Sequence, residues 1–260
     1  MRLLVWNDGQ VIEASQFRPD RPFVMQRIHT LNNQVYHLSR HIEQLREASM
    51  SLFGFASLCG VADAERIIVK LLELSRVSPR LTCPVVMRLD CYGALSFEVE
   101  MPSFNSGMAV RTKRVNGVAI PMSAPSLAYQ SSMSVAVDDM VRAVAEKHGG
   151  EMPIWIDRED NIVSLPWNPI FVVYKGHIFT PQQFETVEYM LAKRAIESLN
   201  MELIVRDIPY SSLLKVDEVF FVDTISVLPL FSIEKHRLLS VVTTRITNRM
   251  EPTISGSISL

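Results

Sequence analysis

SAPSLAYQSSMSVAVDDMVRAVAEKHGGEMPIWIDREDNIVSLPWNPIFVVYKGHIFT, residues 123–180, is the stretch around which the rest of the chain is organised. It predicts an extended segment, a helix, two strands joined by a tight charged turn, and a hairpin. The helix carries apolar residues at the spacing of one face, which are Met133, Val137, Met140, Val141 and Val144. Gly149-Gly150 ends it. Because the chain passes one region twice with short side chains, at Pro125 and Ser164, we expect this stretch to form a cavity wall.

The residues before this stretch predict hairpins, helices and strands. Asn7-Asp8-Gly9 is a strong hairpin turn, since Asn and Gly tolerate positive φ, and Asn32-Asn33 indicates a second hairpin. One apolar face predicts a helix from near Leu38 to Gly54. A second helix is expected around 64–72, followed by strands at 84–92, 95–101 and 108–115.

The residues after it continue the mixed pattern. Pro181 predicts the start of a long helix that runs through Leu199, and strands are expected at 203–206, 219–222 and 227–233. Hairpins and helices are interspersed, so the fold class is α+β in two lobes. We expect a smaller lobe at 1–115, a linker at 116–122, where a Gly and a Pro occur with little periodicity, and a larger lobe at 123–260.

Composition excludes several classes of protein. The 260 residues are 48% hydrophobic and 21% charged, which is typical of a folded globular chain. A net charge of −2 without a Lys/Arg stripe argues against nucleic acid as a partner. No apolar run approaches the roughly 20 residues that span a bilayer, and the first residues are too soon polar for a secretory signal. Cys59, Cys83 and Cys91 form no CxxC pair, so we expect reduced, mostly buried thiols and a cytoplasmic protein.

Short sequence motifs provide little evidence for a metal site or for a particular reaction. His37 and His41 have the spacing of two metal ligands, but a third ligand is not obvious, and capping or packing is the favoured interpretation. Neither a Gly-x-Ser-x-Gly elbow nor a Gly-rich phosphate loop occurs. Asp138-Asp139 are adjacent on a helix, where neighbours point about 100° apart, and are expected to be solvated.

Five segments in chain order carry a more specific signal. They are the turn Asn7-Asp8-Gly9, PFVMQRIHTLNNQVYHLSRHIEQLREAS (22–49), MRLDCYG (87–93), DNIVSLPWNPIFVVYKGHIFTP (160–181) and KVDEVFFVDTISVLPLFSI (215–233). In this order they resemble the class IV aminotransferases, the fold-type IV pyridoxal-phosphate enzymes. That family includes branched-chain and D-amino acid aminotransferases and aminodeoxychorismate lyase. The resemblance implies a two-lobed D-amino-acid-aminotransferase-like architecture, a homodimer and a pyridoxal-phosphate site between the lobes.

The working residues that the resemblance implies are nevertheless replaced. Pyridoxal phosphate needs a lysine amine, yet the lysine position is Pro125, and no lysine lies between Arg114 and Lys147. The position of the carboxylate that faces the ring nitrogen is Ser164. The arginine of the His-x-x-Arg-Leu motif, which binds the phosphate with paired donors, is Gln44.

The resemblance also points to candidates for a phosphate pocket. Thr224 and Ser226 can donate hydroxyl hydrogen bonds to a phosphate, and Arg40, four residues before Gln44 on the same helix, can partly replace the arginine. A solvated Arg40 is the favoured interpretation of that side chain.

Three hypotheses follow. The favoured one is a class IV aminotransferase-like protein that has lost pyridoxal-phosphate catalysis and acts as a non-catalytic or small-anion-binding homologue. The alternative is a working pyridoxal-phosphate aminotransferase or lyase with a relocated lysine, for which Lys113 is a better candidate than Lys175. The third is a structural or interaction module of another fold.

Overall fold

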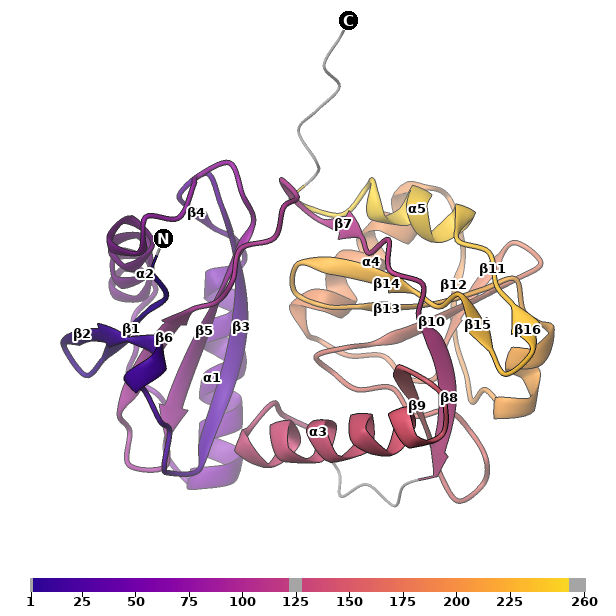
Figure 1. Cartoon of the computed structure of the whole chain (residues 1–260), viewed down its shortest axis with the longest axis horizontal. Coiled ribbons are helices and arrows are strands. Elements are labelled where there is room, and N and C mark those ends of the chain that lie inside the picture. Colours follow the sequence, from indigo (N-terminus) through magenta and orange to yellow (C-terminus); the bar gives the residue numbers. More distant parts are fainter. Residues whose placement is uncertain (1, 122–127, 253–260) are drawn as a thin grey trace, which may run out of the picture. The chain divides into compact units, whose positions relative to one another are not determined.

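The computed structural model describes residues 2–121 and 128–252, which form two compact units (Figure 1). The first unit comprises residues 2–108, 129–133 and 252, and the second comprises 109–121, 128 and 134–251. Pro125, the predicted lysine position, lies outside the described residues.

The first unit contains a six-stranded antiparallel sheet with the strand order β2-β1-β6-β5-β3-β4. Its strands are β1 (Leu4–Asn7), β2 (Gln10–Glu13), β3 (Phe23–Leu31), β4 (Gln34–Val35), β5 (Cys83–Asp90) and β6 (Leu95–Val99). The two predicted hairpin turns are present, since Asp8 and Gly9 join β1 to β2, and Asn32 and Asn33 join β3 to β4, all with positive φ.

Helices α1 (Leu38–Phe53) and α2 (Val61–Ser75) pack on one face of this sheet (Figure 1). The apolar face of α1 buries Leu38, Ile42 and Leu45 against Val24 and neighbouring strand residues. Gly54 ends α1 with a left-handed φ of 79°, as its sequence position predicted. Every second residue of β3 and β5 faces these helices, and the alternate residues form the opposite face.

The second unit contains two mixed sheets. The larger has the strand order β12-β11-β10-β13-β14-β7, and the smaller has the order β16-β15-β8-β9. The strands are β7 (Ala109–Val110), β8 (Asn116–Pro121), β9 (Met152–Ile156), β10 (Ile170–Tyr174), β11 (His177–Thr180), β12 (Leu203–Val205), β13 (Glu218–Val222), β14 (Ser226–Pro229), β15 (Ser232–Ile233) and β16 (His236–Arg237).

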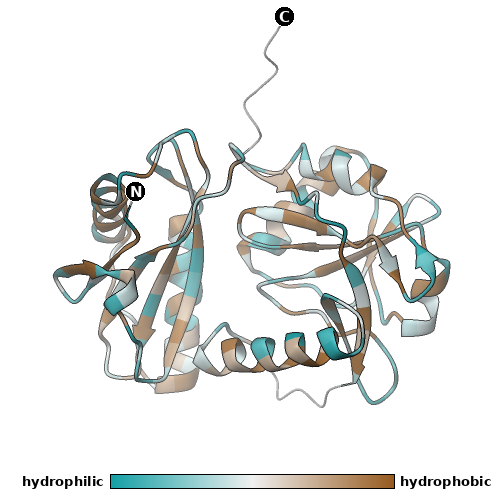
Figure 2. Ribbon diagram, viewed as in Figure 1, coloured by the Kyte–Doolittle hydropathy of each residue, from teal (hydrophilic) through white to brown (hydrophobic). Residues whose placement is uncertain are grey.

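Helices α4 (Val187–Ser198) and α5 (Val241–Thr247) belong to the second unit, as does most of α3 (Ser132–Lys147). Short 3₁₀ helices occur at η1 (Ala14–Gln16) and η2 (Tyr210–Lys215). Figure 2 shows hydrophobic residues along the central strands of each unit, where the cores lie. Among the described helices, none is long and apolar enough to cross a membrane.

The structure differs from the sequence prediction at the expected linker. Asn116–Pro121 form β8, which pairs with β9 and β15. Glycine suits position 117 because neighbouring side chains leave no room for a larger residue. A Cβ at this position would lie 2.7 Å from Cδ1 of Leu230. The strand expected at 108–115 is reduced to Ala109–Val110.

The predicted long helix begins six residues later than expected, at Val187. The hydroxyl of Thr180 donates to the carbonyl oxygen of Gln182, and the hydroxyl of Thr186 donates to that of Pro166 at 2.7 Å. These bonds are made by an extended segment, so the helix cannot start at Pro181. Glu185 therefore precedes the helix, whereas Glu188 lies in its first turn.

Helix α3 also differs from the expected inward stripe. Met133 and Met140 are about half exposed, whereas Val141 and Ala145 are buried in a cluster with Trp155. Residues 161–164, predicted as a strand, form only isolated bridge pairs with other segments. Of the three thiols, Cys59 and Cys83 are buried, and Cys91 is partly exposed.

Candidate functional site

Thr224 and Ser226, the predicted phosphate donors, lie in or next to the turn between β13 and β14. Asp223 builds this turn, because its carboxylate accepts hydrogen bonds from the backbone N–H groups of Ile225 (2.9 Å) and Ser226 (2.7 Å). An aspartate that bonds the backbone two and three residues ahead is a common way to fix a tight turn.

The hydroxyl of Ser226 is surrounded by charged partners. Its Oγ lies 2.9 Å from both carboxylate oxygens of Asp223, and Nε of Arg111 donates to it at 2.7 Å. Arg111 also forms an ion pair with Asp223. Arg111, Asp223 and Ser226 thus form a closed network in which the carboxylate takes up donors from both neighbours.

The hydroxyl of Thr224 also has a carboxylate partner. Its Oγ1 donates to Oε1 of Glu188 at 3.1 Å, and both residues are buried. Glu188 lies in the first turn of α4, where an acidic side chain is favoured by the helix dipole. The contact of Glu188 with Thr224 was not predicted from the sequence.

Ser164, the predicted ring-nitrogen position, is buried in the same unit. Its Oγ accepts a hydrogen bond from the backbone N–H of Ile170 at 3.1 Å, which ties the loop that follows Ser164 to the start of β10. Within this loop, Nε1 of Trp167 donates to Oδ2 of Asp138 at 3.3 Å. Burial raises the pKa of Asp138. Asp138 is therefore not the solvated residue that the sequence suggested.

Gln44 and Arg40, the candidates in the first unit, lie on α1. Gln44 is buried. Nη1 of Arg40 lies 2.6 Å from Glu43 and 3.9 Å from Glu47, so the helix itself supplies acidic partners for this guanidinium.

The remaining candidates are His37 and His41, which have the sequence spacing of two metal ligands. Nδ1 of His41 lies 2.9 Å from Oε1 of Gln26, and His41 is fully buried. His37 caps the start of α1 in the left-handed conformation. Among the residues that the structure describes, no cluster of three or more His, Cys, Asp or Glu side chains has the geometry to hold a metal ion.

The lysines were the main question left by the sequence, and all of them lie in the described residues. They are Lys70, Lys113, Lys147, Lys175, Lys193, Lys215 and Lys235. Lys193 is half-buried and the others are exposed. Nζ of Lys113 lies 2.7 Å from Oε1 of Glu151, with 74% of its side chain exposed.

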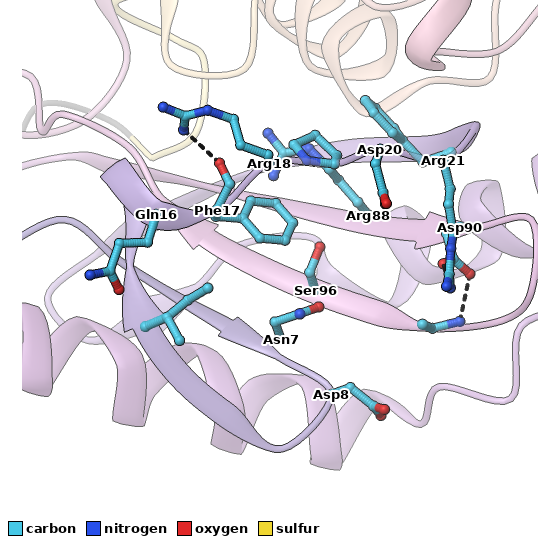
Figure 3. Close-up of a pocket in the computed structure, with 14 residues that line it drawn as sticks. Asn7, Asp8, Gln16, Phe17, Arg18, Asp20, Arg21, Arg88, Asp90 and Ser96 are labelled. Atoms are coloured by element: carbon cyan, nitrogen blue, oxygen red, sulfur yellow. Dashed lines mark hydrogen bonds and ion pairs between the residues drawn. The ribbon is translucent and has the colours of Figure 1, made fainter.

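The first unit has a polar pocket of about 380 Å³ that sequence analysis did not find (Figure 3). Arg88 on β5 reaches it between two aromatic rings, with its guanidinium carbon 5.8 Å from the ring centre of Phe17 and 5.6 Å from that of Phe23. Nη1 of Arg88 lies 2.7 Å from a carboxylate oxygen of Glu98. Phe17 comes from the loop after η1, whereas Arg88 comes from β5, which is distant in the sequence. Local sequence patterns therefore gave no signal for the pocket.

A second ion pair lines the same pocket, between Arg21 and Asp90 at 3.2 Å (Figure 3). Burial acts to raise the pKa of Asp90, but hydrogen bonds from the backbone of Ala94 and Tyr92 and from Arg21 together lower it. The lining side chains include arginine, aspartate, asparagine, glutamine and serine, and contain no lysine, histidine or cysteine. The pocket can therefore bind polar and charged groups, but none of the described residues in its lining is a lysine that could form a Schiff base or a histidine that could act as a near-neutral acid or base.

Comparison with known proteins gives a clear result for the fold. No family model and no curated protein sequence matches the chain. Among solved structures, a branched-chain aminotransferase from Thermoproteus uzoniensis, with norvaline, matches with a TM-score of 0.77 and 18% identity over 95% of this chain and 93% of that one. An aminotransferase from Brucella abortus bound to the cofactor PLP matches with a TM-score of 0.80 and 12% identity over 95% and 97%.

A protein from Legionella pneumophila described as a 4-amino-4-deoxychorismate lyase matches with a TM-score of 0.73 and 10% identity over 89% and 94% of the two chains. These matches establish that the chain has the α+β, two-lobed fold of the class IV aminotransferases, as the resemblance predicted. Since transferases and a lyase share the fold, it does not define a reaction.

Proposed function

We propose that this chain is a non-catalytic protein with the class IV aminotransferase fold, which binds a small ligand or a partner and does not use pyridoxal phosphate. The exposure of its lysines carries the proposal. A lysine that forms a Schiff base is activated where water is excluded or where another cation lies near. Six of the lysines are exposed, and Lys193 is only half-buried.

The corner formed by Thr224 and Ser226 supports the same conclusion. When bound, pyridoxal phosphate supplies an electron sink for reactions at an amino-bearing carbon, but its phosphate needs donors. Here both hydroxyls face carboxylates, Glu188 and Asp223. A phosphate at this corner would meet two negative charges, which Arg111, already paired with Asp223, offsets only in part. The residues present therefore do not fit the phosphate.

Ser164 adds a third argument. A carboxylate beside a pyridine nitrogen keeps that nitrogen protonated, and a neutral hydroxyl does not. The hydroxyl of Ser164 is already an acceptor for the backbone N–H of Ile170. We infer that Ser164 holds its loop in place and has no part in chemistry.

The alternative of a relocated lysine has less support. Lys113 is exposed and lies 2.7 Å from Glu151, and Lys175 is exposed in the turn between β10 and β11. Binding is better supported by the polar pocket of the first unit, whose arginines and aspartates can hold a small charged molecule but supply no amine for a Schiff base.

The test is a titration of the purified protein with pyridoxal phosphate, followed by borohydride reduction and peptide mass spectrometry. We expect only low, scattered labelling of exposed lysines at high cofactor concentration, and no saturable visible absorbance band. The variant Lys113→Ala should behave like the native chain. One stoichiometric pyridoxyl-lysine together with turnover of an amino acid would overturn the proposal.

A further inference from the structure

The second unit contains another groove, of about 650 Å³, which shares no lining residue with the corner at Thr224 and Ser226. Its floor is apolar. Val172 on β10 and Phe179 on β11 are cross-strand partners, so their side chains lie on the same face of the sheet. Val216, after η2, completes the floor, and all three residues belong to the buried core of this unit.

The rim of the groove is basic. The guanidinium carbon of Arg206 lies 4.3 Å from the ring centre of Phe179, and Lys215 lines the groove from η2. In the described parts of the chain, no carboxylate lies within ion-pair distance of either cation. Asp207 is the single acidic residue in the lining, against two cations.

We propose that this groove binds a small amphipathic anion, with an aromatic or branched aliphatic group on the floor and a carboxylate or sulfonate at Arg206 and Lys215. Three observations favour this class of ligand. The volume lies within the range of small-molecule sites, roughly 300–1,000 Å³. The floor is apolar, and the unpaired cations of the rim are complementary to one negative charge.

Arg206 is suited to this role because of how it is held. The cation–π contact with Phe179 holds the guanidinium beside the apolar floor. A planar guanidinium can donate paired hydrogen bonds to a carboxylate. The backbone N–H of Arg206 also donates to the carbonyl oxygen of Thr180, which fixes the start of the segment to the sheet. The proposal goes beyond the proposed function, since it requires neither the presence nor the absence of pyridoxal phosphate.

Calorimetric titration with 3-phenylpropionate tests the site, and the neutral amide of the same acid isolates the contribution of charge. We expect the native chain to bind the acid. It should bind the amide at least about tenfold more weakly, since a charge-assisted hydrogen bond is worth at least about that factor in affinity. The double variant Arg206→Gln/Lys215→Gln should lose a similar factor for the acid and little for the amide.

Two further variants separate this groove from other surfaces. Leu214→Glu, at a partly exposed lining position, adds a negative charge and should also weaken binding of the acid. The matched control is Arg66→Gln/Lys70→Gln, which removes the cations beside a smaller apolar groove of about 310 Å³ in the first unit. This control should bind like the native chain.

The proposal is overturned if the native chain shows no binding of the acid at millimolar concentration, or if acid and amide bind equally. It is also overturned if the control variant loses as much affinity as the rim variant, because the site would then lie elsewhere. Circular dichroism of each variant confirms that a loss of binding does not come from unfolding.

Discussion

His41 is a fully buried histidine in the first unit, and it makes folding sensitive to acid. Burial, followed by the nearby histidines His37 and His29, lowers its pKa to about 3. In the unfolded chain a histidine titrates near 6.5. Between these two values the unfolded chain therefore binds one more proton than the folded chain, so this site's stabilisation is complete above about pH 6.5 and is lost as the pH falls.

We predict that the native chain loses unfolding free energy between pH 7 and pH 5 at up to about 1.4 kcal/mol per pH unit from this one site. His41→Gln should show a flatter dependence, because the titrating group is gone. Urea denaturation at a series of pH values measures both slopes. The control is His148→Gln, the same substitution at an exposed position. Equal slopes for native chain and His41→Gln would contradict the prediction.

The corner formed by Thr224 and Ser226 shows how far single residues allow a site to be predicted. The family resemblance singled out the hydroxyls of Thr224 and Ser226 as candidates. It did not find their acceptors, because Glu188 is 36 residues from Thr224 and its first-turn position has a sufficient local explanation. A residue's partner depends on how distant elements pack, and local pattern does not contain that information.

At the scale of elements, Gly150 governs the passage from α3 to β9. A Cβ at this position would lie 2.6 Å from Cγ1 of Val118 on β8 and 3.4 Å from the carbonyl oxygen of Asn116. The sequence analysis assigned Gly149-Gly150 to the end of the helix. Gly149, with φ of 79°, fits that role, whereas Gly150 is needed for the close approach of two elements.

We predict that Gly150→Ala lowers the unfolding free energy by about 1–3 kcal/mol, the usual cost of forcing a methyl group into a packed site. Gly60→Ala is the matched control, since a Cβ there would meet no atom closer than 3.5 Å. Thermal and urea denaturation of the two variants compares the costs directly. An equal loss in both would show that the general effect of replacing glycine, and not the contact with Val118, is responsible.

Elements with strong local signals were predictable, and elements defined by packing were not. The hairpins at Asn7-Asp8-Gly9 and Asn32-Asn33 and the helix that ends at Gly54 follow from backbone preferences of single residues. Strand β8 was missed because Gly117 and Pro121 have the composition of a linker. The start of α4 was misplaced because hydroxyl bonds of Thr180 and Thr186 hold the preceding segment extended.

At the scale of the whole molecule, the fold follows from the order of weak signals. Five segments, each unspecific alone, predicted an architecture that solved structures share at 18% identity or less. Each unit has its own buried core, so the apolar residues that specify the fold of one unit differ from those that specify the other. The lobe boundaries at 115 and 123 stay predictions, and β8, inside the expected linker, pairs with strands of the second unit.

The resemblance also predicts a homodimer, and the half-exposed methionines Met133 and Met140 on α3 are apolar surface available to a partner. We expect sedimentation equilibrium to give twice the mass of one chain at micromolar concentration. The measured mass should fall toward that of one chain only when the protein concentration is below the dissociation constant of the dimer. A single-chain mass throughout the accessible range would contradict the prediction.

The hydrogen bond from Thr224 to Glu188 has a consequence for how the protein responds to its surroundings. A protein whose donors are satisfied by a dissociable ligand gains stability in proportion to the logarithm of ligand concentration, and loses it when the ligand is scarce. Glu188 belongs to the chain, so the acceptor for Thr224 is present at every concentration of every metabolite. The stability that this hydrogen bond contributes therefore does not depend on the concentration of any ligand.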